Sequence, residues 1–76
     1  MSIQNSVGSR LRQLRTQKKL SQERLANEIG MDRTYIASVE NGKRNISIKN
    51  LEKIWLFFQL SPKEFFDDDI FEKSAE

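Results

Sequence analysis

The chain contains no cysteine and no histidine, and its apolar residues never form a long run. Without cysteine there is neither a disulfide nor a thiolate site, and without histidine the commonest general base and metal ligand is missing. These absences argue against metalloenzymes and triad hydrolases, so we expect no enzyme activity, no cofactor and no bound metal. The longest apolar run, residues 54–58, is far shorter than the about 20 residues that a membrane span needs, and no charged-then-apolar N-terminal signal is visible. We therefore expect a soluble, cytoplasmic protein.

The chain is also short, with 76 residues, which predicts a single domain over residues 1–76. A domain of this size buries only about 60% of the surface that its unfolded chain exposes, so its stability is marginal unless a partner adds buried area. Dimerisation would supply that area. We expect the first few and last few residues to fray.

Residues 21–45, SQERLANEIGMDRTYIASVENGKRN, have the pattern of two short helices joined by a tight turn. Ser21 can cap the first helix, and Gly30 follows at the point where the chain must turn. Asp32 can cap the second helix. The pattern therefore predicts a helix-turn-helix. Its helices are expected over residues 22–29 and 33–40.

The apolar and small residues of this segment fall on the faces that two crossing helices must bury. Ala26 is a small residue at the expected crossing, where two helices approach closely. The second helix starts with a polar, arginine-bearing sequence, which is what a DNA major groove would meet. The residues expected to point inward are Leu25, Ala26, Ile29, Ile36 and Val39.

Three further helices complete the predicted domain, an all-α fold of five helices. A stripe of Val7, Leu11 and Leu14 marks the first helix, and an i, i+3, i+4, i+7 pattern of apolar residues after Ser47 marks the fourth. The sequence Ser-Pro-Lys-Glu over 61–64 is a capping box with proline at the first helical position. The expected ranges are about 6–18, 48–58 and 62–72.

The net charge of +2 conceals a strong asymmetry. Residues 1–49 carry ten Lys or Arg against four Asp or Glu, a net of +6, whereas residues 50–76 carry three against seven, a net of −4. A basic surface docks on phosphate and an acidic one is repelled by it. The alternative is that basic residues merely solvate helix faces, but Lys43 and Arg44 cluster just beyond the candidate recognition helix. We therefore predict DNA binding by the first half, with the acidic tail pointing away from DNA.

The segment DRTYIASVENGKRN resembles the phage-repressor-like helix-turn-helix family, also called the Cro/repressor or XRE type. Within that family it is most similar to the controller proteins of restriction-modification systems. The resemblance covers roughly residues 9–66. It implies a lambda-repressor-like DNA-binding fold and a factor that binds its own promoter and times expression of an endonuclease relative to its methyltransferase.

Four residues of the predicted recognition helix are candidates for reading bases. Arg33 suits a bidentate contact with the O6 and N7 edge of guanine. Thr34 can hydrogen-bond a base or place its methyl group against that of thymine, and Ser38 can reach a base edge or a phosphate. Tyr35 can contact or stack on DNA, or it can simply cover the core, because tyrosine is commonly half buried. Many family members carry Gln or Ser where this chain has Arg33 and Tyr35, so the operator cannot be inferred from theirs.

A second group of residues is expected to bind phosphate. Gln22 lies in the first turn of its helix, where free backbone N–H groups and the helix dipole favour an anion, and the family uses this position likewise. The loop after the recognition helix looks like the family's second backbone clamp, which carries no sequence information of its own. The residues of this clamp are Asn41, Lys43, Arg44 and Asn45.

Arg15 and Glu40 are charged residues among apolar positions of helices that should pack together. From the residues alone they could be two exposed charges. The resemblance implies a partly buried ion pair that ties the first helix to the end of the recognition helix. We therefore assign this pair to the architecture and not to readout.

Six of the seven aromatic residues fall between positions 55 and 71, and one helix face cannot bury them all. Trp55 and Phe58 are assigned to the core, and the excess is expected to form an apolar patch that a twofold dimer would cover. The alternative is that Phe65 and Phe66 only cover the monomer core. The run of aspartates at 67–69 is expected to be the solvated start of a frayed tail and not a metal site. The predicted dimer interface consists of Leu56, Phe57, Phe65, Phe66 and Ile70.

Together these features predict a homodimeric, sequence-specific transcriptional regulator on palindromic double-stranded DNA, with half-sites about 34 Å apart. A phage-type or chromosomal repressor is the alternative of the same class. A protein-binding module, such as an antitoxin that neutralises a partner through the aromatic C-terminal face, is the alternative of another class. If the protein activates transcription, an acidic residue such as Glu23 could contact RNA polymerase.

Overall fold

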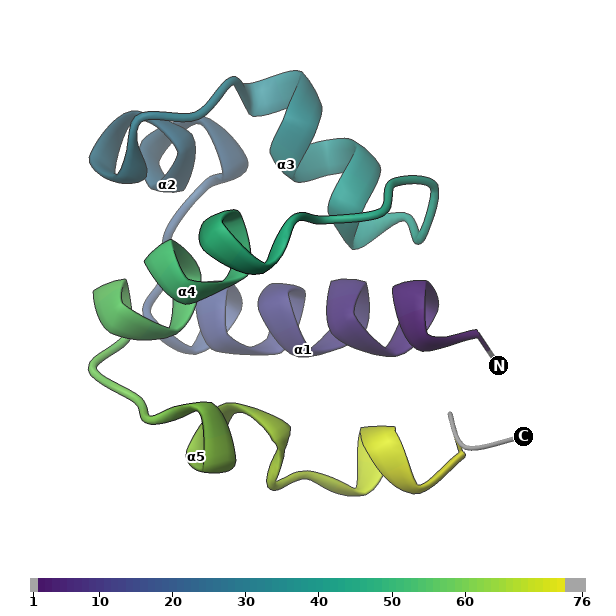
Figure 1. Ribbon diagram of the computed structural model, residues 1–76. Helices are drawn as coiled ribbons and strands as arrows, with labels where there is room; N and C mark the ends of the chain where they lie inside the picture. The colour runs from purple at the N-terminus through teal and green to yellow at the C-terminus, as the bar shows by residue number, and fades with distance from the viewer. Residues whose placement is uncertain (1, 74–76) are drawn as a thin grey trace.

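The computed structural model describes residues 2–73, which contain five α-helices, one 3₁₀-helix and no strand (Figure 1). Parts of two expectations, the single domain over 1–76 and the frayed ends, concern residues 1 and 74–76 and lie outside the described residues. Along residues 2–73 we find no helix with both the length and the apolarity that crossing a membrane requires. The helices are α1 (Ile3–Gln17), α2 (Gln22–Ile29), α3 (Arg33–Glu40), α4 (Ile48–Phe57), α5 (Pro62–Phe66) and the 3₁₀-helix η1 (Asp69–Lys73).

Serine side chains cap four of the α-helices. Each cap residue has extended backbone angles, and its hydroxyl oxygen accepts a hydrogen bond from the backbone N–H three residues later, over 3.0–3.2 Å. At α5 the cap is reciprocal, because the Glu64 carboxylate accepts from the Ser61 backbone N–H at 2.8 Å. The capping serines are Ser2, Ser21, Ser47 and Ser61.

Asp32 differs from these serines. It occupies the N-cap position of α3 with extended backbone angles, but its side chain makes no capping hydrogen bond. The predicted position of the helix start is therefore right, whereas the predicted capping bond is absent.

One apolar core joins all five α-helices. The predicted inward residues of α1, α2 and α3 are buried, except that Ile29 is only half buried. Phe58 is buried as expected, while Trp55 is half buried and packs against the core. The buried apolar residues are Val7, Leu11, Leu14, Leu25, Ala26, Ile36, Val39, Ile54, Phe58 and Phe65.

Three predicted helix boundaries need correction. The first helix starts at Ile3 instead of residue 6, because Ser2 is the cap and Ser6 is buried inside the helix. It ends at Gln17 and the fourth helix at Phe57, each one residue earlier than expected. The chain leaves both helices through a left-handed residue, Lys19 at φ 57° and Gln59 at φ 59°.

The last predicted helix, 62–72, is interrupted. α5 ends at Phe66, and η1 begins only at Asp69. Two interactions compete with a continuous helix here. One is local, because Asp68 Oδ1 accepts from the Ile70 N–H at 2.9 Å, and the other is long-range, because the Glu64 and Phe65 carbonyl oxygens accept from the Arg10 side chain. Asp68 is thus half buried and engaged, contrary to the expectation of a fully solvated aspartate run.

The elements form three levels in Figure 1, with α2 and α3 uppermost, α1 and α4 in the middle, and α5 and η1 at the bottom. Both ends of the described chain lie on the same side of the molecule. The molecule measures 33 × 24 × 23 Å along its principal axes. α1 therefore separates the helix-turn-helix from the C-terminal segment.

Candidate nucleic-acid interface

The turn between α2 and α3 has the geometry that the sequence predicts. Gly30 adopts the left-handed conformation at φ 69°, which glycine allows without strain, and the next residue closes the turn with a backbone hydrogen bond from Met31 N to Ala26 O at 2.8 Å. Ala26 is buried at the crossing of the two helices. α3 is thereby held across α2 with its first turn exposed.

A close contact between α1 and α3 fixes the recognition helix from below. A Cβ atom at Gly8 would collide with the carbonyl oxygen of Val39 and lie 2.8 Å from that of Glu40. Only glycine allows the two backbones to approach this closely. The sequence analysis did not identify this position, although a glycine inside a predicted helix is a signal for such an approach.

The first two residues of α3 present their side chains to solvent. Arg33 and Thr34 are exposed, and within residues 2–73 neither makes a side-chain hydrogen bond or ion pair. Ser38, one turn later, is half buried. A guanidinium group with five unengaged donors at a helix start is well placed for a base edge in a groove.

Tyr35 combines features of the two roles considered for it. Its ring is half buried and packs against the core, and its hydroxyl oxygen accepts a hydrogen bond from Asn50 Nδ2 at 3.1 Å. The Arg44 guanidinium lies over the ring at 4.8 Å from the centroid. Tyr35 therefore links α3 to α4 and to the following loop, and Asn50 is a partner that no sequence signal identified.

The loop between α3 and α4 carries the four predicted clamp residues, and all four are exposed. Two are held by α1: Asn41 Oδ1 accepts from Arg12 Nη2 at 3.5 Å, and Asn45 Oδ1 accepts from Gln4 Nε2 at 2.5 Å. Lys43 has no side-chain partner within residues 2–73. This positively charged loop thus begins at the far end of α3, and its Arg44 reaches back over Tyr35 in the first turn of that helix.

Glu40, at the other end of α3, is the centre of a buried network. Its side chain is 0% exposed, and its carboxylate accepts from Arg15 Nε at 2.6 Å and Arg15 Nη2 at 3.0 Å. Arg12 Nε adds a contact at 3.3 Å, and Gln22 Nε2 donates at 3.2 Å. The Arg15 side chain also donates to the Leu20 carbonyl oxygen at 2.6 Å, which ties the network to the turn before α2.

Protonation of this network reflects the same contacts. Burial raises the pKa of Glu40, but the hydrogen bonds from Arg15 and Gln22, with the charge of Arg15 and the bond from Arg12, outweigh it and leave the pKa below its ordinary value. The hydrogen bond to Glu40 raises the pKa of Arg15, against the effect of burial. Both groups therefore stay charged at neutral pH.

Gln22 lies where it can both support the Glu40 network and bind a phosphate. It lies in the first turn of α2, as a phosphate ligand would, yet its side-chain amide is hydrogen-bonded to Glu40. Donation of one amide N–H to Glu40 leaves the second N–H of that amide and the free backbone N–H groups of the first turn for an anion.

The predicted dimer residues divide into three groups. Phe65 is 0% exposed in the monomer and lies at the centre of the aromatic cluster, so its assignment to an interface is wrong. Phe57 and Ile70 are half buried. Leu56 and Phe66 are exposed, at 63% and 38%, as are two apolar residues that the prediction omitted, Ile3 and Ile48.

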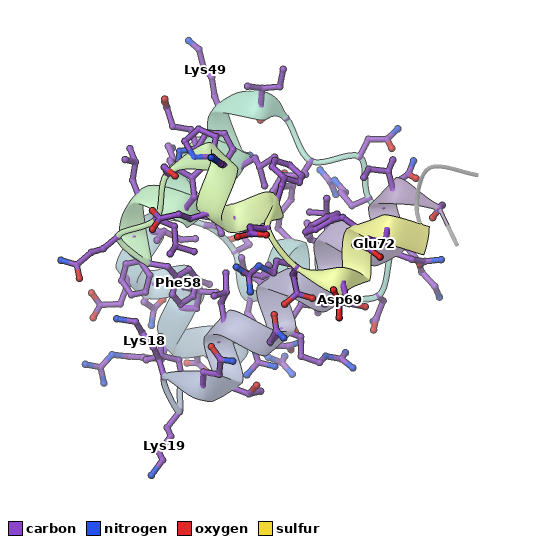
Figure 2. All side chains as sticks on the ribbon, turned by 90° about the horizontal axis from the view of Figure 1, so that it is seen from below. Lys18, Lys19, Lys49, Phe58, Asp69 and Glu72 are labelled. Carbon is purple, nitrogen blue, oxygen red and sulfur yellow. The ribbon has the colours of Figure 1, made fainter. Side chains whose placement is uncertain are left out.

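Charge is distributed as the sequence suggests. α2, α3 and the basic loop lie on one side of α1, and α5 and η1 lie on the other (Figure 1). Asp69 and Glu72 belong to η1, well separated from Lys18 and Lys19 at the far end of α1 (Figure 2). An anionic duplex on the α2–α3 side would therefore be separated from the acidic segment by the body of the protein.

Comparison with known proteins agrees with this geometry. A family model described as helix-turn-helix matches residues 11–65. A control protein of Mycoplasma sp, C.MunI, is 50% identical over 67 residues, which cover 87% of this chain and 90% of that protein.

Solved structures give the same result. The restriction-modification controller protein C.AhdI from Aeromonas hydrophila is 46% identical, with a TM-score of 0.77 over 83% of this chain and 96% of its own. The controller protein C.Esp1396I, solved as a tetramer in complex with its natural 35-base-pair operator, is 31% identical, with a TM-score of 0.81 over 100% of both chains.

Proposed function

Because the chain belongs to the helix-turn-helix family, we propose that it is a sequence-specific DNA-binding transcriptional regulator that acts as a homodimer on a palindromic operator. The likeness to controller proteins over nearly its whole length supports the finer assignment, an autoregulating controller of a restriction-modification system. The matched family is one of DNA-binding regulators and not of enzymes. We also propose that it acts in the cytoplasm, as a regulator in direct contact with its DNA.

One observation carries the proposal: the start of α3 is exposed and unengaged, while its far end is fixed by the buried Glu40 network. A rigid scaffold that presents free side chains is what direct readout of a major groove requires. In this proposal Arg33 reads guanine, and its neighbours on α3 contribute further base contacts. The base-reading set is Arg33, Thr34, Tyr35 and Ser38.

Phosphate contacts are assigned to both sides of the recognition helix. Gln22 and the free N–H groups of the first turn of α2 bind one phosphate. The loop after α3 binds the backbone on the other side through exposed amides and cations. This loop set is Asn41, Lys43, Arg44 and Asn45.

Two copies associate through the apolar surface that the monomer leaves exposed near its C-terminus. We assign to this surface the exposed Leu56 and Phe66 and the half-buried Phe57 and Ile70. A 76-residue chain gains buried area from such a contact. The twofold axis would place the two recognition helices about one duplex turn apart.

Selection of bound sequences from a random duplex pool, at two salt concentrations, tests the proposal. We expect a twofold-symmetric site whose two halves each contain a guanine that the protein requires. Weak enrichment without symmetry, and with a steep salt dependence, would contradict sequence-specific binding and favour the protein-binding alternative. If the recovered site lies upstream of the protein's own gene, a promoter-reporter assay with and without the protein measures autoregulation directly.

A further inference from the structure

Arg10 is a buried cation on a different side of α1 from the Glu40 network. Its side chain is 11% exposed, and residues 10 and 15 are separated by about 140° around a helix of 3.6 residues per turn. Arg10 Nε donates to the Phe65 carbonyl oxygen at 2.7 Å and Nη2 to the Glu64 carbonyl oxygen at 2.9 Å. Nη1 donates to Gln13 Oε1 at 2.7 Å and lies 3.6 Å from the Asp68 carboxylate.

Three of these four partners, Glu64, Phe65 and Asp68, belong to residues 61–73, which we call the C-terminal arm. α5 has only five residues, and helices shorter than about 12 residues are not stable by themselves, so contacts with the rest of the protein must hold the arm. The Phe65 side chain anchors it in the core. Packing of an apolar side chain fixes how deeply the arm is inserted into the core, but it does little to fix the rotation of α5. A planar guanidinium bound to two successive carbonyl oxygens fixes the rotation of α5 about its own axis.

The rotation of α5 about its axis determines the direction in which the exposed apolar side chains of the arm point. Phe66 directly follows the carbonyl group that Arg10 holds, and its ring contacts Phe71 with a centroid distance of 4.8 Å. Phe66 and Ile70 belong to the proposed dimer surface. Arg10 thus acts on that surface from inside the monomer, without lying in it.

α1 also connects the arm to the recognition helix. Arg15 holds the end of α3 through Glu40, and Arg10 holds the end of α5, so the two are joined through one continuous helix. The molecule is 33 Å long. If the arm turns relative to the rest of the protein by roughly a tenth of a radian, the opposite end of the molecule moves by about 3 Å relative to the arm. This displacement is close to the about 3.4 Å rise of one base pair.

We propose that Arg10 is a positioning residue for DNA recognition: it orients the C-terminal arm and thereby sets the distance between the two recognition helices of the dimer. The specificity that it determines is the spacing of the two half-sites, not the bases within them. This inference rests on the proposed dimeric function.

The test compares Arg10→Met with Lys63→Met. The control removes one positive charge from an exposed position of the C-terminal arm, whereas Arg10→Met removes one from the buried position on α1 that holds this arm. The probes are a duplex with the selected symmetric site, the same duplex with one base pair inserted or removed between the halves, and a single half-site. Sedimentation equilibrium gives the dimer dissociation constant. For the wild type and Lys63→Met we expect at least tenfold weaker binding to the altered spacings.

For Arg10→Met we expect this spacing preference to fall below threefold and the dimer dissociation constant to rise at least tenfold. Half-site affinity should stay within twofold of the wild type, because the polar partners of Arg10 lie in α1 and the C-terminal arm and not in α3. Joining two Arg10→Met copies through a flexible linker should restore tight binding but not the spacing preference. If Arg10 only stabilised the fold, joining the two copies would restore affinity and spacing preference together.

Arg10→Lys covers the case in which Arg10→Met does not fold. It keeps the positive charge but cannot bind two carbonyl oxygens as a fork, so the same loss of spacing preference is expected. A dimeric wild type whose folded Arg10 variants keep the spacing preference would overturn this inference alone, as would an equal loss of half-site and full-site affinity. A wild type that binds only as a monomer would overturn the dimeric function and this inference with it.

Discussion

The two ends of α3 are built in opposite ways. At the first end Arg33 and Thr34 are exposed and unengaged within the described residues, and the N-cap Asp32 makes no side-chain capping bond. At the other end the Glu40 carboxylate is fully buried and receives hydrogen bonds from three side chains. The side chains at the first end are available to bind another molecule, whereas those at the other end are engaged in contacts within the fold.

The difference teaches how a small domain separates recognition from stability. Exposed side chains without internal partners contribute little to folding, so their replacement changes binding alone. Removal of a buried carboxylate from its charged partners is strongly destabilising, because a cation is left without its counter-charge, and such a carboxylate does not contact a ligand. The next four experiments test this separation.

Replacement of Glu40 should have the largest effect. Glu40→Ala leaves Arg15, whose side chain is 13% exposed, without its counter-charge, and we expect the free energy of unfolding to fall by about 3 kcal/mol or more. Urea unfolding followed by circular dichroism measures this loss. The matched control is Glu28→Ala, which removes an exposed pair with Arg24 and should change stability by less than about 1 kcal/mol. Equal losses in the two variants would show that the Glu40 network stabilises the fold no more than an exposed ion pair does.

Replacement of Arg33 should change recognition without changing stability. For Arg33→Ala we expect loss of preference at one guanine in each half-site, about 1–3 kcal/mol in discrimination, with an unchanged urea midpoint. Fluorescence anisotropy with matched and substituted duplexes gives the discrimination. Arg33→Lys is the control, because it keeps the charge but lacks the bidentate fork. Guanine preference that persists in Arg33→Ala would assign readout to another residue, whereas a preference that is only weakened in Arg33→Lys would measure what the fork adds.

Replacement of Lys43 should have a smaller and less selective effect. Lys43 is exposed in the loop after α3, so Lys43→Ala should weaken binding to all duplexes by a similar factor. The slope of the logarithm of affinity against the logarithm of salt concentration should decrease in magnitude by about 1. Salt titrations on a specific and an unrelated duplex measure both quantities. An effect confined to the specific duplex would mean that Lys43 reads bases.

Lowering the pH should produce the smallest change, a loss of the stability that Glu40 contributes at the buried end of α3. The pKa of Glu40 is below its ordinary value of about 4.3, so its contribution to stability is complete above that value and is lost as the pH falls through the lower pKa of the folded state. We expect the stability difference between the wild type and Glu40→Gln to be greatest at neutral pH and to narrow as the pH falls below the ordinary pKa of glutamate and through the lower pKa of the folded state. Urea unfolding across this range measures it, and a difference independent of pH would contradict the assignment.

The helix-turn-helix could be predicted closely because its signals are local. Ser21, Gly30 and the apolar spacing between them define the second helix and its turn, and α2 and α3 have the expected bounds. Exposure of Arg33 follows from the same periodicity. The base and phosphate roles stay predictions, because no nucleic acid is present to test them.

The C-terminal segment could not be predicted in the same way, because long-range contacts decide it. A good capping box starts α5, but contacts with α1 from more than 50 residues away accompany its end at Phe66. Burial of Phe65 likewise depends on how the arm folds back. Arg10 lies between Val7 and Leu14 on the buried stripe of α1, and this position was the one signal of an internal partner.

Trp55 lies at the junction between the helical body and the C-terminal arm. It is the single tryptophan of the chain, and its ring centroid is 6.2 Å from that of Phe65. Movement of the arm away from the body would replace an aromatic neighbour of the indole with water. The intrinsic emission of the native protein therefore reports arm docking as an optical signal, without any dye or engineered label.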